Sequence, residues 1–205
     1  MPSPARAGDL DAPRQLIAEA MRGSSTTAGE AAAQLHALLA REPKNAEARA
    51  MLGLAIVLQA RDAPMLRKRA LAAAGFAEMD AAVAQAPDSI EARLIRATNA
   101  SQMPLVLGRN EIATDDFRRL LGRIEEDARD VSPSLRRRIL FHAGAFALRE
   151  RRFEAVSLLE RALRIEATEP RTEEIQSMLA LARRQLTPRR HADVEDENQA
   201  QAAAP

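Results

Sequence analysis

The chain has 205 residues, of which 46% are apolar and 29% are charged, a composition typical of a globular protein rather than a disordered one. It contains no cysteine, which excludes disulfides, thiolate metal sites and thiol nucleophiles. Its net charge is +1, from 30 basic and 29 acidic residues, so any electrostatic attraction to nucleic acid or anionic lipid must be local.

The kind of apolar residue predicts an all-α protein. Alanine and leucine, which have the lowest cost in a helix, dominate, whereas Trp and Tyr are absent and Phe occurs five times. Residues typical of strands rarely cluster, and strict two-residue alternation does not occur.

Proline and N-cap residues divide the chain into helical segments with apolar residues at spacings of three and four. The predicted helices span about residues 10–21, 27–41, 45–61, 65–86, 88–102, 110–127, 132–150, 152–166 and 170–186. Thr27 and Asp88 each begin a capping-box pattern, Asn45 and Asn110 are candidate N-caps, and Ser132 precedes a proline at the first helical position. The short loops predict antiparallel neighbours.

The two ends of the chain differ from the helical part. Residues 1–8 and 188–205 have too little apolar surface to offset the entropy of ordering, so we expect them to be disordered around one helical domain at 9–187. The N-terminal stretch lacks the apolar core of a secretory signal. The most apolar run, at 50–60, is about half of the roughly 20 residues that span a bilayer. We therefore expect a cytoplasmic protein without a membrane partner.

Several helices share a pattern of small and large apolar residues. A small residue is followed after four positions by a large one, and after three more by Leu or Ala: Ala31, Leu35 and Leu38; Ala113, Phe117 and Leu120; Ala155, Leu159 and Ala162. Gly75 and Met79 form a weaker fourth match, in which Gly replaces the usual Ala. The apolar face of the helix at 152–166 is expected to include Phe153, Val156, Leu159, Ala162 and Leu163.

The preceding helices carry a second pattern, of which Leu52-Gly53 with Ile56, and Ala143 with Phe146, are examples. Together with Pro43 after Leu38, these spacings resemble the tetratricopeptide repeat family, in which such residues alternate between helix A and helix B of a hairpin. Aligned positions stand 44, 38 and 42 residues apart, so the repeats are longer and less regular than the family's period of about 34. The resemblance implies a right-handed α-solenoid of about four antiparallel hairpins and a C-terminal capping helix.

The resemblance also implies where a partner binds. In the family, helix A of each hairpin lines a concave groove, and its exposed positions hold a peptide or helix of another protein. The corresponding positions here are Leu54, Val57, Leu94, Thr98, Arg137 and Leu140.

Catalytic and metal-binding patterns are absent from the sequence. The three histidines have no metal-ligand spacing, and no serine lies in a nucleophile elbow. Acidic pairs such as Asp115-Asp116 lack calcium-loop spacing and are interpreted as solvated. His142 is interpreted as packing on Phe141 and Phe146. We therefore expect no enzyme, no cofactor and no metal.

Arginine is the one unusual polar feature. Residues 133–165 contain eight Arg against three Glu, including Arg136, Arg161 and Arg164. Such a surface could accept an acidic peptide or a nucleic-acid backbone, or it could be an ordinary solvated surface. Elsewhere, Arg93 and Arg96 lie one turn apart and are expected to brace the loop at 104–109.

The sequence thus predicts a non-enzymatic scaffold that binds a peptide or helix of a partner protein, and self-association remains open. The alternative is a nucleic-acid-associated helical protein that uses the arginines after Pro133. The near absence of aromatic residues, on which bases could stack, argues against RNA.

Overall fold

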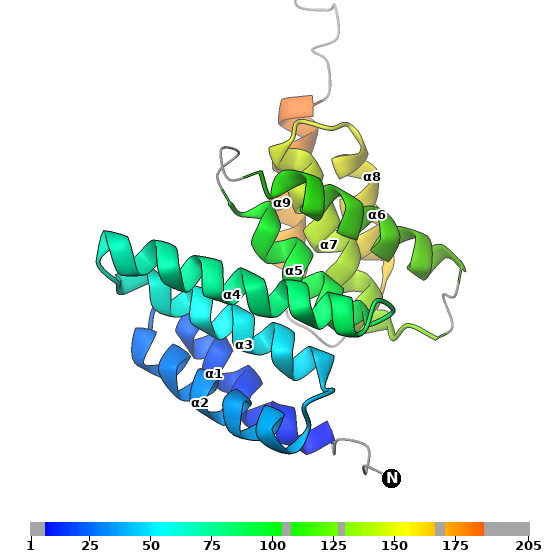
Figure 1. The fold of residues 1–205 in the computed structure, drawn as a ribbon. Helices are drawn as coiled ribbons and strands as arrows, with labels where there is room; N and C mark the ends of the chain where they lie inside the picture. The colour runs from blue at the N-terminus through cyan, green and yellow to red at the C-terminus, as the bar shows by residue number, and fades with distance from the viewer. Residues whose placement is uncertain (1–6, 104–107, 127–129, 167–170, 187–205) are drawn as a thin grey trace, which may run out of the picture. The chain divides into compact units, whose positions relative to one another are not determined.

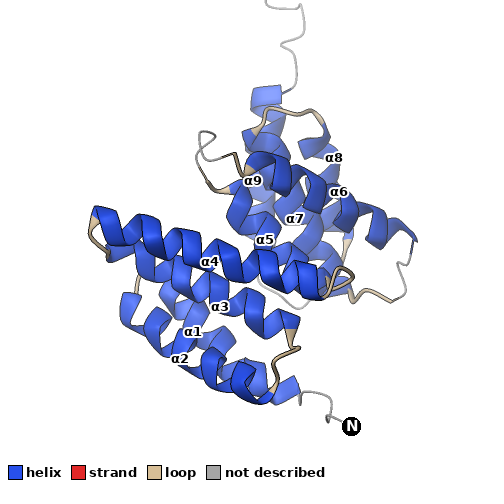
Figure 2. Cartoon of the chain, in the orientation of Figure 1, coloured by secondary structure: helices blue, strands red, loops and turns tan. Residues whose placement is uncertain are grey.

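The computed structural model describes residues 7–103, 108–126, 130–166 and 171–186. Every regular element in these ranges is a helix, which confirms the all-α prediction (Figure 2). No helix in the described ranges is both long and apolar enough to cross a bilayer. The disorder predicted for residues 1–8 and 188–205 falls outside these ranges except at residues 7 and 8, which belong to a short helix that begins at Ala7.

The chain divides into two compact units at Gly122, within α6. The expectation that residues 9–187 form a single domain stays a prediction. The first unit contains η1 (Ala7–Leu10), α1 (Asp11–Met21), α2 (Ser25–Arg41), α3 (Ala46–Gln59), η2 (Ala60–Asp62), α4 (Met65–Gln85), α5 (Ile90–Ser101) and most of α6 (Asn110–Glu126). The second unit contains the end of α6, α7 (Pro133–Arg149), α8 (Glu154–Arg164) and α9 (Thr172–Leu186).

The helices begin close to where the sequence placed them, and four of the starts, those of α2, α3, α5 and α7, have a side-chain cap. Asn45 accepts a hydrogen bond from the Ala48 amide at 2.9 Å, and Ser132 caps α7, both as predicted. Two predicted caps are wrong, since Ser24 caps α2 in place of Thr27, and Ser89 caps α5 in place of Asp88. In both cases the serine has the extended backbone that a capping residue needs, with its side chain outside the first turn.

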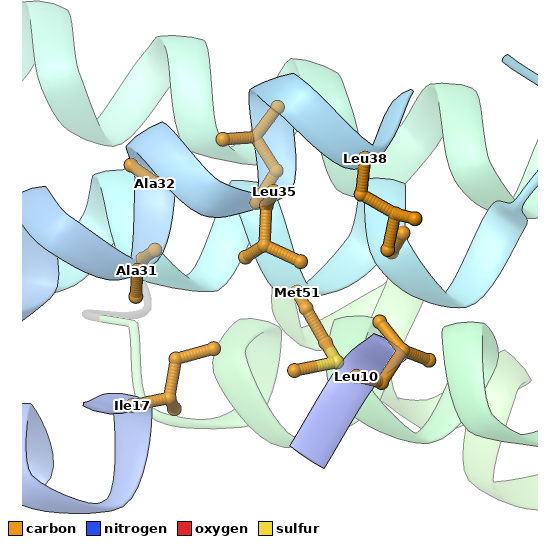
Figure 3. Packing of buried hydrophobic residues seen from close by; sticks show 10 residues of the cluster. Leu10, Ile17, Ala31, Ala32, Leu35, Leu38 and Met51 are labelled. Atoms are coloured by element: carbon orange, nitrogen blue, oxygen red, sulfur yellow. The ribbon is translucent and has the colours of Figure 1, made fainter. Parts of the chain in front are cut away.

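In the first unit α3 is the central helix (Figure 1). It packs on α1, α2, α4 and α5, and α1 also packs on α2. The core between α1, α2 and α3 is seen from close by in Figure 3, where Leu35, Leu38 and Met51 fill the space between the helices. Leu35 and Leu38 are two of the repeat positions.

The repeat positions predicted on the second helix of each hairpin are buried, whereas Ile56 on a first helix is half-buried and Pro43 is exposed. The buried positions are Ala31, Leu35, Leu38, Gly75, Met79, Ala113, Phe117, Leu120, Ala155, Leu159 and Ala162. Such agreement is expected when each residue lies on the face that its helix turns to a neighbour. A solenoid arrangement of the helices stays a prediction.

Glycines allow close helix contacts in both units. A Cβ atom on Gly53 of α3 would lie 2.4 Å from the carbonyl oxygen of Gly75 on α4 and 2.8 Å from Met79 Cγ. In the second unit, a Cβ atom on Gly144 of α7 would lie 2.8 Å from Leu159 Cγ on α8. Met79 and Leu159 are equivalent in the repeat alignment, so the same packing contact occurs in both units.

In the second unit α8 packs on α7 and on α9. The prediction that Phe153 belongs to the apolar face of α8 is wrong, since 71% of its surface is exposed. The helix starts at Glu154, so Phe153 precedes the first turn, while Leu158 takes part in the core.

Candidate functional site

The six predicted partner-binding positions differ in exposure. Leu54, Val57 and Thr98 are half-buried, whereas Leu94, Arg137 and Leu140 are at most 5% exposed. The expectation that these last three are exposed is therefore wrong. Four positions lie in the first unit and two in the second.

Contacts with neighbouring helices explain this burial. Leu54 packs against the core of the first unit, and the Cγ2 atom of Val57 would lie 2.7 Å from a Cβ atom on Gly75. Leu94 lies on α5, which packs on both α3 and α4. The Arg137 guanidinium donates a hydrogen bond of 2.7 Å to the Thr172 hydroxyl at the start of α9. Leu54, Val57, Leu94 and Arg137 thus take part in contacts between helices, and Leu140 lines a pocket.

The pocket is a hollow of about 240 Å³ in the second unit. Its lining combines basic with aliphatic side chains: Ile124, Arg136, Leu140, Arg161, Arg164 and Ile165. Helical spacing explains the grouping, because Arg136 and Leu140 lie one turn apart on α7, as do Arg161 and Ile165 at the end of α8. The name arginine pocket is used for this hollow below.

The arginine pocket has more positive charge than its acidic neighbours compensate. Arg161 donates a hydrogen bond of 3.1 Å to Glu125. Within the described part of the chain, Arg164 has no ion pair and the buried Nε atom of Arg136 has no hydrogen-bond partner. Other arginines of this unit pair with glutamates: Arg149, Arg152, Arg171 and Arg183. Arg136 and Arg164 therefore give the pocket positive charge that no described acidic side chain pairs with, as is also true of Arg138, Arg151 and Arg184 elsewhere in this unit.

The floor of the arginine pocket is apolar. Ile124 is 5% and Leu140 is 2% exposed, while Ile165 is half-buried. Guanidinium groups above aliphatic side chains can form paired hydrogen bonds to a carboxylate or phosphate, while the floor contacts an adjacent apolar group.

A second charged cluster, in the first unit, was missed from the sequence. Asp116 on α6 is 0% exposed, so its interpretation as a solvated acid is wrong. Arg93 Nη1 contacts its Oδ1 at 2.7 Å, and Arg96 binds both of its oxygens at 2.8 Å. The hydrogen bond to Asp116 is the main cause that raises the pKa of Arg96. The sequence did contain a signal that Asp116 is buried, because this residue shares a helical face with the core residues Ala113 and Phe117.

The cluster continues to α4. Arg96 Nη1 lies 3.2 Å from Asp80 Oδ1, and Arg109 Nη1 lies 2.9 Å from Asp80 Oδ2. The Arg109 guanidinium also stacks 4.6 Å from the centre of the Phe76 ring. Arg93 and Arg96 thus join α5 to α6, and Arg96 also joins it to α4. They were expected to brace the loop at 104–109, of which residues 104–107 lie outside the described ranges. The donors and acceptors satisfy one another, which is typical of a structural cluster.

His142 in the second unit is a titratable group whose pKa is strongly lowered. Burial, with smaller effects of the positive charges of Arg171 and Arg138, lowers the pKa of its imidazole from 6.5 to about 3. Its ring centre lies 5.0 Å from that of Phe141, the packing contact expected from the sequence. Within the described ranges no three His, Cys, Asp or Glu side chains are grouped to hold a metal ion. The absence of a catalytic function, a cofactor and a metal stays a prediction.

Comparison with known proteins finds no match to this chain among protein-family models, curated proteins or solved structures.

Proposed function

We propose that this protein is a non-enzymatic scaffold that binds an acidic segment of a partner protein in the arginine pocket. The observation that carries the proposal is the arginine pocket itself, in which three arginines surround an apolar floor: Arg136, Arg161 and Arg164. In the described part of the chain, Glu125 is the one glutamate that pairs with any of them. A partner segment with a carboxylate beside an aliphatic side chain would satisfy both parts of this lining.

The size of the pocket favours a side chain over a cofactor. Its volume of about 240 Å³ is below the range of roughly 300–1,000 Å³ typical of small-molecule sites. A peptide side chain would fill it while the rest of the peptide lies on the surface. This is the expected behaviour of a recognition pocket within a larger interface.

A helical-repeat architecture of the tetratricopeptide type is part of the same proposal. Supporting observations are the buried repeat positions and the matching contacts of Gly53 with Met79 and of Gly144 with Leu159. Helices two apart in the chain also pack on each other, as α1 does on α3, α3 on α5, and α7 on α9. This alternation is the one that stacked hairpins produce.

Binding of a nucleic-acid backbone is the second candidate, since guanidinium groups also bind phosphate. The aliphatic floor favours the peptide, because a nucleic acid has no aliphatic side chain to fill it, and no Trp or Tyr offers a stacking surface.

Site-directed photocrosslinking in the native cell tests the proposal. Glu166 is exposed and follows the pocket residue Ile165. A photoreactive amino acid at this position therefore lies beside the pocket and leaves the pocket itself free for a partner. We expect an adduct whose crosslinked peptide carries Asp or Glu beside an aliphatic residue. The adduct should be lost in the double variant Arg136→Gln/Arg164→Gln.

Arg184→Gln is the matched control, because this exposed arginine lies on α9 and does not line the pocket. It should leave the adduct unchanged. Affinity of the identified peptide for the purified protein, measured by fluorescence anisotropy, should fall at least tenfold in the double variant. An adduct that persists in the double variant would refute the proposal, and recovery of RNA or DNA with a strong salt dependence would favour the second candidate.

A further inference from the structure

One end of the first unit exposes large apolar side chains. In the described part of the chain, four large hydrophobic residues are exposed, and three of them are Met21 at 58%, Met65 at 68% and Leu66 at 86%. Met21 ends α1, and the other two begin α4. These ends meet because the Arg61 guanidinium in η2, just before α4, donates a hydrogen bond of 3.0 Å to the carbonyl oxygen of Ala20. Figure 1 shows α4 beginning where α3 ends.

The same end is basic. Arg67, Lys68 and Arg69 follow Leu66 directly, and their side chains form no ion pair or hydrogen bond with other described residues. Arg22, after Met21, is also exposed. The acidic residues beside these segments are Glu19 and Asp62. The Oδ1 atom of Asp62 lies 3.8 Å from the Nε atom of Arg61. The set Met21, Arg22, Met65, Leu66, Arg67, Lys68 and Arg69 is called the α4 tip below.

Helix stability does not explain these cations. The start of a helix carries partial positive charge, which favours acidic side chains and disfavours basic ones. The first turn of α4 has no acidic residue, and Pro64 before it provides no side-chain cap. Exposed Leu and Met side chains likewise add nothing to the folded core. Both features are therefore better explained by something that the α4 tip binds.

We infer that the α4 tip docks on the surface of an anionic phospholipid bilayer. Met21, Met65 and Leu66 would enter the boundary between headgroups and acyl chains, while the basic side chains contact lipid phosphates. The combination of apolar and cationic side chains at one helix end is the one that an anionic interface attracts. The expectation of no membrane partner concerned spanning segments and net charge, and neither bears on a local patch. The arginine pocket belongs to the other unit, so this inference is independent of the proposed function.

Vesicle flotation with the full chain tests the inference. We expect binding to vesicles of phosphatidylglycerol mixed with phosphatidylcholine, weakening with salt, and no binding to phosphatidylcholine alone. Binding should fall at least tenfold in Met65→Ser/Leu66→Ser, and separately in Arg67→Gln/Lys68→Gln/Arg69→Gln. Matched controls in the second unit are Phe153→Ser, which removes the fourth exposed hydrophobic, and Arg183→Gln/Arg184→Gln, and neither should change binding.

Insertion can be measured separately, because the chain has no tryptophan. In Leu66→Trp the emission of the introduced tryptophan should shift to the blue with anionic vesicles and be quenched by brominated acyl chains. Absence of binding to anionic vesicles would overturn the inference. So would binding without a blue shift or without sensitivity to Met65→Ser/Leu66→Ser, since either result means adsorption by charge alone. Far-UV circular dichroism of each variant shows whether it is folded, and these exposed positions should tolerate the changes.

Discussion

The carbonyl oxygen of Gly75 occupies the place that a side chain on Gly53 would need. A Cβ atom on Gly53 would lie 2.4 Å from that oxygen, and one on Gly75 would lie 2.5 Å from the oxygen of Gly53. The contact is mutual and involves backbone atoms of α3 and α4, which cannot move as a flexible side chain can. Gly75, the weakest residue of the repeat alignment, is thus one of the most constrained by packing.

Gly75→Ala should lower the free energy of unfolding by about 2–3 kcal/mol, because the two helices must separate to admit the methyl group. Urea denaturation measures the change. Gly29→Ala is the control, since Gly29 lies in α2 and a Cβ atom added there would have no atom within 4 Å, so alanine should stabilise by about 0.5–1 kcal/mol. Equal effects at the two glycines would contradict the packing argument.

Asp116→Asn should destabilise the first unit by about 3–5 kcal/mol, because Arg93 and Arg96 would keep their charges without the buried carboxylate. The adjacent Asp115→Asn should have a far smaller effect. Its carboxylate pairs with Arg119 at the surface, a hydrogen bond that lowers the pKa of Asp115 but is screened by solvent. Thermal unfolding of the two variants makes the comparison, and a larger loss for Asp115→Asn would show that Asp116 is not the buried partner.

Acid should destabilise the second unit through His142. The folded pKa of about 3 lies below the unfolded value of 6.5, so the stability that depends on the neutral ring is fully present above pH 6.5 and declines as the pH falls towards 3. Between about pH 6.5 and 4.5 the loss should be about 2–3 kcal/mol. His142→Gln should remove this part of the pH dependence, as measured by urea denaturation at each pH. The exposed His36 supplies the control His36→Gln, which should leave the pH dependence as it is.

Phe153→Ala should change stability by less than about 0.5 kcal/mol, because the ring is 71% exposed and precedes α8. Leu159→Ala, at a position that is 0% exposed, should cost about 2–5 kcal/mol. Chemical denaturation monitored by far-UV circular dichroism compares the two. A loss of several kcal/mol for Phe153→Ala would restore Phe153 to the core face predicted from the sequence.

The arginine pocket was predicted in part. The sequence singled out Arg136, Arg161 and Arg164 as a basic segment and Leu140 as a binding position. It did not indicate that they meet, because α7 and α8 bring them together only by packing. Ile124, from the end of α6, had no sequence signal that distinguished it from any other core residue.

Local interactions let the sequence determine the helices and their buried faces. Caps such as Asn45 and Ser132, and apolar spacings of three and four, act within one or two turns, so they can be read without the rest of the fold. Only the tertiary structure decided the burial of Asp116, the exposure of Phe153 and the contact of Gly53 with Gly75. Each of these depends on atoms that lie far away in the chain. A helical pattern shows which face is apolar, but the neighbouring helix decides which residues of that face are covered and which charges are buried with them.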